Sequence, residues 1–194
     1  MLRVRDDDAE AFEELMLRYQ NRVLRVLQHL VGRRGSAEDL AQDVFLRVYR
    51  ARKSYVAGAK FSTWLFTIAN NVAANALRSR SRRREVNVVD DPHDDDGARP
   101  LEQMALEASG LMPTRQLDKS EMREVVRLAL ESLNERQRLA VLLSKFEHMS
   151  YAEISEVMEL SESAIKSLLS RARENLRDVL EPYLSHGEKP ADQR

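Results

Sequence analysis

The segment Asp39-Leu-Ala-Gln-Asp-Val-Phe-Leu-Arg-Val-Tyr-Arg50 decides the fold, because its apolar residues recur at the three- and four-residue steps of one helix face. We expect this face to enter a core. It comprises Leu40, Val44, Phe45 and Val48, with Tyr49 at its edge. The opposite face comprises Asp39, Gln42, Asp43, Leu46, Arg47 and Arg50. Such a face is either an ordinary solvated helix surface or a surface that docks on another protein.

Helical periodicity extends to both sides of this segment. Apolar residues mark a helix over residues 9–30, which Gly32 and Gly35 end. Ser36 is then expected to cap the next helix, with an acidic residue at the third position after it. The helix that Ser36 caps is expected to end near residue 53. A loop over residues 54–60 and a third main helix over residues 61–80 are expected to follow.

The second half of the chain begins with a polar stretch and then becomes periodic again. Residues 86–118 hold turn formers, like charges and little periodicity, which is typical of a solvated linker, with a short helix expected over residues 101–108. Beyond residue 119, Asn134 with Gln137 and Ser150 with Glu153 form capping boxes at the starts of two helices. The second of these helices is expected to be short and to end at residue 158, followed by a turn over residues 159–161. Ser161 is expected to cap a final helix that runs from residue 162 to about 180 and is stopped by Pro182.

These patterns predict an all-α protein of two small helical domains joined by a flexible acidic linker, with a helix-turn-helix in the C-terminal domain. Only 6 glycines and 5 prolines in 194 residues agree with an all-helical fold. The expected divisions are a first domain over residues 1–85, a linker over 86–118, a second domain over 119–185 and a frayed tail over 186–194.

The net charge of −1 conceals three differently charged parts. Residues 1–85 hold 17 Lys/Arg against 10 Asp/Glu (net +7), residues 86–118 hold 2 against 8 (net −6), and residues 119–194 hold 12 against 14 (net −2). Neutralisation of phosphates supplies most non-specific affinity for DNA. We therefore expect the second domain to bind DNA weakly by itself and to depend on a larger assembly.

Several classes of function find no support in the sequence. The absence of cysteine excludes disulfides, thiolate zinc sites and thiol nucleophiles, and suits a cytoplasmic protein. The histidines lie far apart, and no glycine-rich phosphate loop occurs. The carboxylates of Asp94–Asp96 are interpreted as solvated charge. We therefore expect no enzyme activity, no metal, no cofactor and no small-molecule substrate. The N-terminus lacks an apolar export segment, and no run approaches the roughly 18 apolar residues of a membrane span.

The helix-turn-helix pattern places polar groups on one side of the final predicted helix. Its apolar stripe comprises Ile165, Leu168, Leu169, Ala172, Leu176 and Val179. The polar side comprises Ser163, Lys166, Ser167 and Ser170, with Arg171 and Arg173 on the flanks. Short polar groups and forked donors suit base edges in the major groove, and cations suit phosphates. The alternative is a plain three-helix bundle with a solvated basic face. Glu159 stands where many such motifs have glycine, and a non-glycine residue is tolerated there if the turn avoids positive φ.

A second candidate nucleic-acid surface begins at Lys60-Phe-Ser-Thr-Trp-Leu-Phe66. Phe61 and Trp64 are either ordinary core residues or ring faces on which bases of an opened strand stack. Asn71 is either a surface amide or a group that reads an exposed base, since asparagine both donates and accepts. The same helix continues with Asn75, Arg78 and Arg80, and then with Arg82, Arg83 and Arg84, which we expect to hold phosphates.

These motifs together resemble the extracytoplasmic-function (ECF) group of bacterial RNA polymerase sigma factors, over nearly the whole chain. The resemblance rests on the segment 39–50, on Lys60 to Asn71, on Met149-Ser-Tyr-Ala-Glu-Ile-Ser155 and on Ser163-Ala-Ile-Lys-Ser-Leu168 followed by Arg171-Ala-Arg173. Leu168 replaces a residue that is usually basic in the family. Because the first helix begins close to Met1, we expect a few residues usual at the start of the family to be missing.

The resemblance implies a role for each group of candidate residues. Asp39, Gln42, Asp43 and Leu46 are implied contacts to the clamp coiled coil of the largest polymerase subunit. The implied contacts to the minus-ten element are Lys60, Phe61, Trp64, Asn71, Asn75, Arg78 and Arg80. The implied contacts to the minus-thirty-five element are Ser163, Lys166, Ser167, Ser170, Arg171 and Arg173.

The resulting expectation is a cytoplasmic sigma factor that confers promoter specificity on bacterial RNA polymerase. Its expected partners are core polymerase, through the clamp coiled coil and the flap, promoter DNA and an anti-sigma factor. The alternatives are a stand-alone helix-turn-helix regulator that binds duplex DNA without polymerase, and an interaction protein whose amphipathic units bind partner helices.

Overall fold

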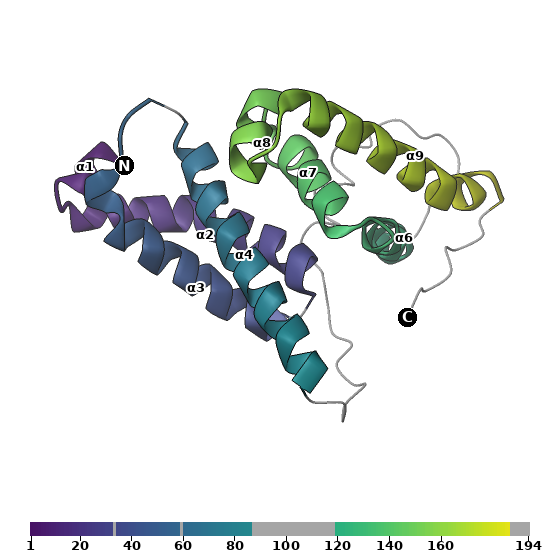
Figure 1. Cartoon of the computed structure of the whole chain (residues 1–194), viewed down its shortest axis with the longest axis horizontal. Helices are drawn as coiled ribbons and strands as arrows, with labels where there is room; N and C mark the ends of the chain where they lie inside the picture. Colours follow the sequence, from purple (N-terminus) through teal and green to yellow (C-terminus); the bar gives the residue numbers. More distant parts are fainter. Residues whose placement is uncertain (33, 59, 87–118, 187–194) are drawn as a thin grey trace.

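The computed structural model describes residues 1–32, 34–58, 60–86 and 119–186, and the elements in those ranges are all helices (Figure 1). They form an N-terminal unit up to residue 86 and a C-terminal unit from residue 119. The predicted all-α fold with two helical domains is therefore confirmed. The predicted linker, with its short helix over residues 101–108, and residues 187–194 lie outside the described residues. Within the described ranges, no helix has an apolar stretch long enough to cross a bilayer.

The N-terminal unit packs long helices around a core of aliphatic side chains. Its elements are α1 (Leu2–Arg5), α2 (Ala9–Val31), α3 (Arg34–Arg50), the 3₁₀ helix η1 (Arg52–Ser54) and α4 (Phe61–Val86). Val23 of α2, Val44 of α3 and Leu65 of α4 have no exposed surface. The predicted core face of α3 is thus confirmed, except that Tyr49 is 42 % exposed and lies against Phe12, with ring centroids 5.1 Å apart.

The C-terminal unit contains α6 (Lys119–Glu131), α7 (Glu135–Lys145), α8 (Tyr151–Met158) and α9 (Glu162–His186). Both predicted capping boxes are present. The Asn134 side chain accepts from the Gln137 backbone N–H at 2.9 Å, and the Glu153 carboxylate accepts from the Ser150 backbone N–H at 2.7 Å. Ser161 caps α9 by accepting from the Ala164 N–H at 3.2 Å, as predicted. Local hydrogen bonds therefore fix the starts of these helices.

The two ends of α3 differ from the prediction. The helix begins at Arg34, so Ser36 lies in its first turn and is not the N-cap. A glycine in that turn costs the helix roughly 1 kcal/mol, and Ala37 of the same turn is completely buried. At the other end α3 stops at Arg50 rather than near residue 53, and the chain tightens into η1. The Arg52 side chain donates to the Tyr49 carbonyl at 2.9 Å and satisfies one of the terminal acceptors.

Two helices run further than predicted. α4 continues to Val86 instead of ending near residue 80, since the added residues include arginines, which are good helix formers. α9 continues through Pro182 to His186, so the predicted stop at that proline is wrong. Proline removes one hydrogen bond from a helix, but Tyr183 is only 4 % exposed, and its burial holds the last turn in place.

The two units touch each other along two pairs of helices. α2 contacts α7, and α4 contacts α8, which places α8 of the C-terminal unit beside α4 in Figure 1. Buried aliphatic residues from both units belong to one continuous apolar cluster. The described chain is therefore a closed arrangement in which residues more than 80 positions apart in sequence contact one another.

Candidate nucleic-acid and polymerase interfaces

The polar face of α9 is open to solvent while its apolar face is fixed in the core. Ile165 and Ala172 have no exposed surface, and Leu169 is 6 % exposed. The predicted polar side divides by exposure: Ser163, Lys166, Ser167, Arg171 and Arg173 are exposed and Ser170 is half-buried. α9 therefore has a rigid back, packed on α7 and α8, and a hydroxyl-rich and cationic front.

Two departures from the usual motif have clear structural consequences. Leu168 is half-buried and packs against the core, as its place beside the apolar stripe predicts. Glu159 ends α8 in the left-handed region, with φ of 54° and ψ of 42°. The turn therefore does not avoid positive φ, so the condition for tolerating a non-glycine residue without strain is not met. The Leu160 N–H donates to the Ser155 carbonyl at 3.1 Å across this turn, which is the closure that a left-handed residue permits.

The start of α4 carries a cluster of aromatic side chains. The Phe61 ring lies 5.2 Å from Tyr19 and 6.0 Å from Trp64, and the Trp64 ring lies 5.2 Å from Tyr55. Phe61 and Trp64 are half-buried, so part of each side chain faces solvent. Both interpretations from the sequence thus keep a structural basis, since the rings pack together and also retain exposed surface. Lys60 extends from the same end and lies 2.9 Å from the Glu153 carboxylate of α8.

Further along α4 the polar residues form an exposed strip. Asn71, Asn75 and Arg78 are exposed. Arg78 donates to the Asn75 side-chain oxygen at 2.7 Å, which orients both side chains. Arg80 is half-buried and donates to the Val31 carbonyl at 3.2 Å, so it also satisfies the end of α2. Of this set, Arg80 is the residue with a structural contact to another helix.

The outward face of α3 combines charge with exposed apolar surface. Asp39 and Gln42 are exposed, and Asp43 pairs with Arg47 one turn later at 3.0 Å. Leu46 is 53 % exposed between these polar groups. An apolar side chain ringed by charge on a rigid helix is a suitable anchor for a protein partner.

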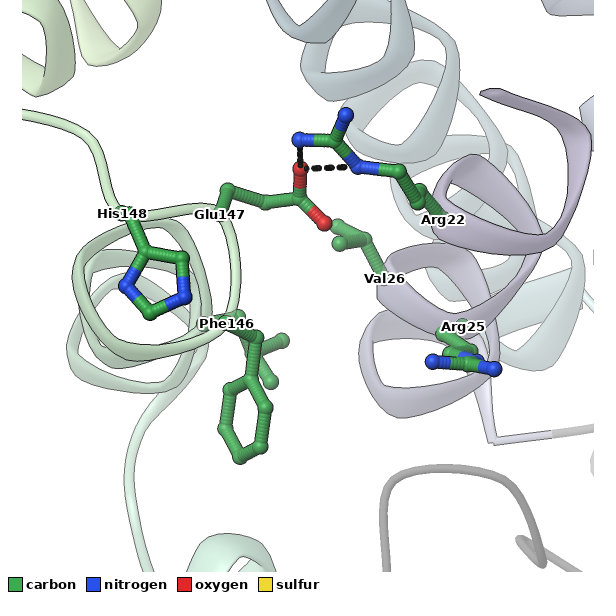
Figure 2. A pocket seen from close by; sticks show the side chains of 7 residues that line it. Arg22, Arg25, Val26, Phe146, Glu147 and His148 are labelled. Carbon is green, nitrogen blue, oxygen red and sulfur yellow. Dashed lines mark hydrogen bonds and ion pairs between the residues drawn. The ribbon is translucent and has the colours of Figure 1, made fainter. Parts of the chain in front are cut away.

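A cavity of about 320 Å³ lies where α2 meets the end of α7, and sequence reasoning did not identify its residues (Figure 2). It is lined by Arg22, Arg25, Val26, Leu142, Phe146, Glu147 and His148. Arg22 donates through Nε to the Glu147 carboxylate at 2.9 Å and makes a second ion-pair contact through Nη2. The Glu147 side chain is only 5 % exposed, so burial raises the pKa of this carboxyl against the opposing effect of Arg22. No local sequence signal marks this pair, because its members are 125 residues apart.

Other contacts between the units are equally non-local. Asn70 donates to the Val157 carbonyl of α8 at 3.2 Å, and Arg138 of α7 donates to the His29 carbonyl of α2 at 3.0 Å. On the α8 side of the first contact, hydrogen bonds from Lys60 and then from the Ser150 backbone lower the pKa of Glu153. The structure therefore brings Lys60 of the predicted minus-ten set against the C-terminal unit.

Comparison with known proteins decides the family. The Sigma-70 region 2 family matches residues 15–83, and the Sigma-70, region 4 family matches residues 123–176. The chain belongs to the ECF group of the sigma-70 family. It is 33 % identical over 184 residues to the RNA polymerase sigma-H factor of Pseudomonas aeruginosa, covering 94 % of this chain and 92 % of that one. It is 31 % identical over 187 residues to the ECF RNA polymerase sigma-E factor of Escherichia coli, covering 94 % and 93 %.

A solved structure shows the same fold. The sigma factor RpoE in complex with the anti-sigma factor NepR from Bartonella quintana superposes with a TM-score of 0.69 at 23 % identity, covering 89 % of this chain and 98 % of that one. The family matches and the identity to the named sigma factors show that this chain is a sigma factor, which confers promoter specificity on bacterial RNA polymerase in transcription initiation. The ECF resemblance inferred from the motifs is confirmed, and the stand-alone regulator is not supported.

Proposed function

We propose that the two units divide promoter recognition between them. The N-terminal domain, over residues 1–85, docks on core polymerase and captures the minus-ten element, and the C-terminal domain, over residues 119–185, reads the minus-thirty-five element as duplex. The observation that carries this proposal is the geometry of α9, whose exposed Ser163, Lys166 and Ser167 stand over a buried apolar back. A helix held in that way can lie in a major groove without unfolding its own core.

The face of α3 supports the docking role. Asp39, Gln42, Asp43 and Leu46 stand on one rigid helix whose other side is locked into the core by Val44 and Val48. We propose that this face binds the clamp coiled coil of the largest polymerase subunit. The exposed Leu46 supplies apolar contact, and the carboxylates fix the register.

The first turns of α4 support the strand-opening role. The half-buried rings of Phe61 and Trp64 are braced by Tyr19 and Tyr55, so they present fixed faces to an extruded base. Stacking on such faces contributes roughly 1–3 kcal/mol per base. Asn71 and Asn75 offer donors and acceptors further along the helix, and Arg78 and Arg80 lie near enough in sequence to hold the adjoining phosphates.

We propose that the chain acts in the cytoplasm by binding alone, without catalytic chemistry of its own, and contacts the polymerase flap through its C-terminal domain. An anti-sigma factor is a further proposed partner. A solved structure with this fold is the sigma factor RpoE in complex with the anti-sigma factor NepR from Bartonella quintana.

Run-off transcription with purified core polymerase and a promoter pool tests the proposal. We expect the chain to associate with core enzyme and to redirect initiation to a defined set of promoters. Lys166→Ala and Arg171→Ala should each weaken use of those promoters by roughly 5- to 150-fold, the effect of about 1–3 kcal/mol per lost contact. Arg18→Ala, an exposed cation on α2, is the charge-matched control and should change little. A chain that neither binds core polymerase nor shifts initiation would contradict the proposal.

A further inference from the structure

The turn between α1 and α2 contains a residue in an unusual backbone conformation. Asp7 has φ of 68°, in the left-handed region, which glycine adopts freely and which is costly for a residue with a side chain. Its side chain is exposed, so burial does not offset that cost. The turn is fixed on both sides, because Val4 of α1 is buried and Asp8 caps α2 by accepting from the Ala11 N–H at 2.9 Å. The neighbours of Asp7 therefore hold it in place and present its carboxylate from a fixed point.

The Asp7 carboxylate binds the 3₁₀ helix η1. Arg52 donates through Nε to one carboxylate oxygen at 2.8 Å, and Lys53 donates through Nζ to the other at 2.5 Å. These hydrogen bonds, from Lys53 first and then from Arg52, hold the pKa of Asp7 below its ordinary value. The Arg52 guanidinium also lies 4.0 Å from the centroid of the Tyr49 ring, and its side chain is only 20 % exposed. An isolated exposed ion pair contributes little to stability, but a carboxylate that joins two cations of one short helix forms a network with a defined geometry.

η1 leads directly into the aromatic cluster at the start of α4. The Tyr55 N–H donates to the Arg52 carbonyl at 3.3 Å, so the residue that binds Asp7 with its side chain also holds Tyr55 with its backbone. Tyr55 is buried, and its ring lies 6.2 Å from Phe61 and 5.2 Å from Trp64. A displacement of η1 therefore moves a ring on which both Phe61 and Trp64 pack.

We propose that Asp7 is a positioning residue for strand opening, because its contact with η1 sets the placement of the Phe61 and Trp64 rings. This inference rests on the proposed role of these rings as stacking faces for an extruded base. When the carboxylate is lost, η1 and Tyr55 are free to shift, and the rings must then be ordered at the moment the base binds, which slows strand opening. Closed-complex formation is unaffected, since the proposed contacts of α3 and α9 lie outside the α1–α2 turn and η1.

Fluorescence of the free chain tests the placement of the rings without polymerase. Trp64 is the one tryptophan in the sequence, so quenching by acrylamide reports on this cluster. Asp7→Asn removes the charge and keeps the shape of the side chain, and asparagine tolerates the left-handed region. We expect the quenching constant of Trp64 to rise about twofold in this variant, because a half-buried ring that loses its brace is more accessible. Asp6→Asn removes the adjacent exposed carboxylate, which pairs with Arg5 at 3.6 Å, and is the matched control that should leave quenching unchanged.

Opening kinetics with core polymerase and promoter test the consequence for initiation. Asp7→Asn should slow opening of the minus-ten element roughly threefold, a fraction of the full stacking contribution of a base, and should leave closed-complex affinity within about twofold of the original. Arg52→Gln should also slow opening, and the double variant should be no slower than Arg52→Gln alone, since both changes remove the same interaction. Asp7→Gly, which lacks the carboxylate and relieves the left-handed backbone, should open as slowly as Asp7→Asn.

The outcomes separate this inference from the proposed function. Unchanged Trp64 quenching in folded Asp7→Asn, checked by circular dichroism, would overturn the positioning role even if the unaltered chain directs transcription. Raised quenching with an unchanged opening rate, or the same slowing in Asp6→Asn, would also overturn it. If the unaltered chain neither binds core polymerase nor shifts initiation, the proposed function fails, while raised quenching in Asp7→Asn would still support the contact between Asp7 and the aromatic cluster.

Discussion

At the scale of single residues, stability at the turn between α8 and α9 is limited by backbone geometry. Glu159 adopts φ of 54°, where a side chain beyond glycine costs roughly 1–2 kcal/mol. Its carboxylate is exposed, so the position gains little from the side chain in return. The strain lies beside the start of the proposed recognition helix.

We predict that Glu159→Gly stabilises the C-terminal unit by about 0.5–1 kcal/mol, since glycine relieves the strain but loses more chain entropy on folding. Urea unfolding monitored by circular dichroism measures the change. Glu159→Gln keeps the backbone strain and should leave the midpoint unchanged. A glycine variant less stable than the original chain would show that the left-handed conformation is not strained in solution.

A second residue-scale effect concerns His29, which is buried near Arg138. Burial and then the Arg138 charge lower the pKa of His29 from 6.5 to about 4. Between pH 6.5 and about 4, His29 therefore stays neutral in the folded chain and is protonated in the unfolded chain. The contribution of neutral His29 to the free energy of unfolding is present in full above pH 6.5. It is lost as the pH falls from there to about 4, and the loss is on the order of 3 kcal/mol.

The prediction is tested by comparing His29→Leu with the original chain in urea at pH 7 and at pH 4.5. The variant cannot take up the proton, so it should lose less stability between the two pH values. Carboxylates titrate in both proteins, and the comparison removes their contribution. Identical losses in the two proteins would mean that His29 is accessible to protons in the folded state.

At the scale of elements, α4 unites a structural and a proposed functional role in the same side chains. The Trp64 ring packs on Tyr55 at 5.2 Å and remains half-buried. Its removal therefore costs packing as well as any base stacking. A control that loses comparable packing elsewhere is needed to separate the two effects.

We predict that Trp64→Ala slows strand opening roughly tenfold while leaving closed-complex affinity nearly unchanged, because stacking on the ring matters only after bases are extruded. Stopped-flow fluorescence of a labelled minus-ten base measures opening, and filter binding measures the closed complex. Phe12→Ala, a half-buried ring that contacts Tyr49 instead, is the packing control and should not slow opening. Equal losses at both stages would count against a melting role for Trp64.

Local chemistry explains which elements the sequence was able to predict. The starts of α7, α8 and α9 are set by side chains within three residues, so Asn134, Ser150 and Ser161 were predicted as caps and found as caps. The end of α9 was misplaced because tertiary burial decides it, whereas α4 continues through residues that are themselves good helix formers. Tyr183 carries α9 past Pro182, and nothing in the neighbouring residues indicates that this tyrosine is buried.

At the scale of the whole molecule, the sequence predicted two helical units but not how they meet. The exposure pattern of the α9 face followed from periodicity, since an apolar back leaves a polar front. Pairing across the units depends on surfaces that no local period encodes. Arg22 is an ordinary charged residue of α2 and Glu147 lies in the loop after α7, and only packing leaves the Glu147 side chain 5 % exposed.

Arg138 donates hydrogen bonds both within the C-terminal unit and to the N-terminal unit. Its guanidinium donates to the carbonyls of Leu130, Glu131 and Leu133, at 2.9, 2.8 and 2.9 Å, at the turn between α6 and α7. It also donates to the His29 carbonyl at the end of α2 in the other unit, at 3.0 Å. One planar fork thus satisfies terminal acceptors of two helices that belong to different units.

We predict that Arg138→Ala destabilises the chain by at least about 3 kcal/mol, because several charge-assisted hydrogen bonds are lost together and their acceptors remain partly buried. Arg138→Lys should recover less than half of this loss, since an ammonium cannot reproduce the fork. Arg136→Ala, an exposed neighbour on the same helix, should lie within about 0.5 kcal/mol of the original chain. Urea unfolding measures all three, and energy transfer between dyes on α2 and α9 reports the inter-unit part. If Arg138→Ala lowers stability but leaves energy transfer unchanged, its role is confined to the α6–α7 turn, and the apolar cluster with the remaining polar contacts holds the units together.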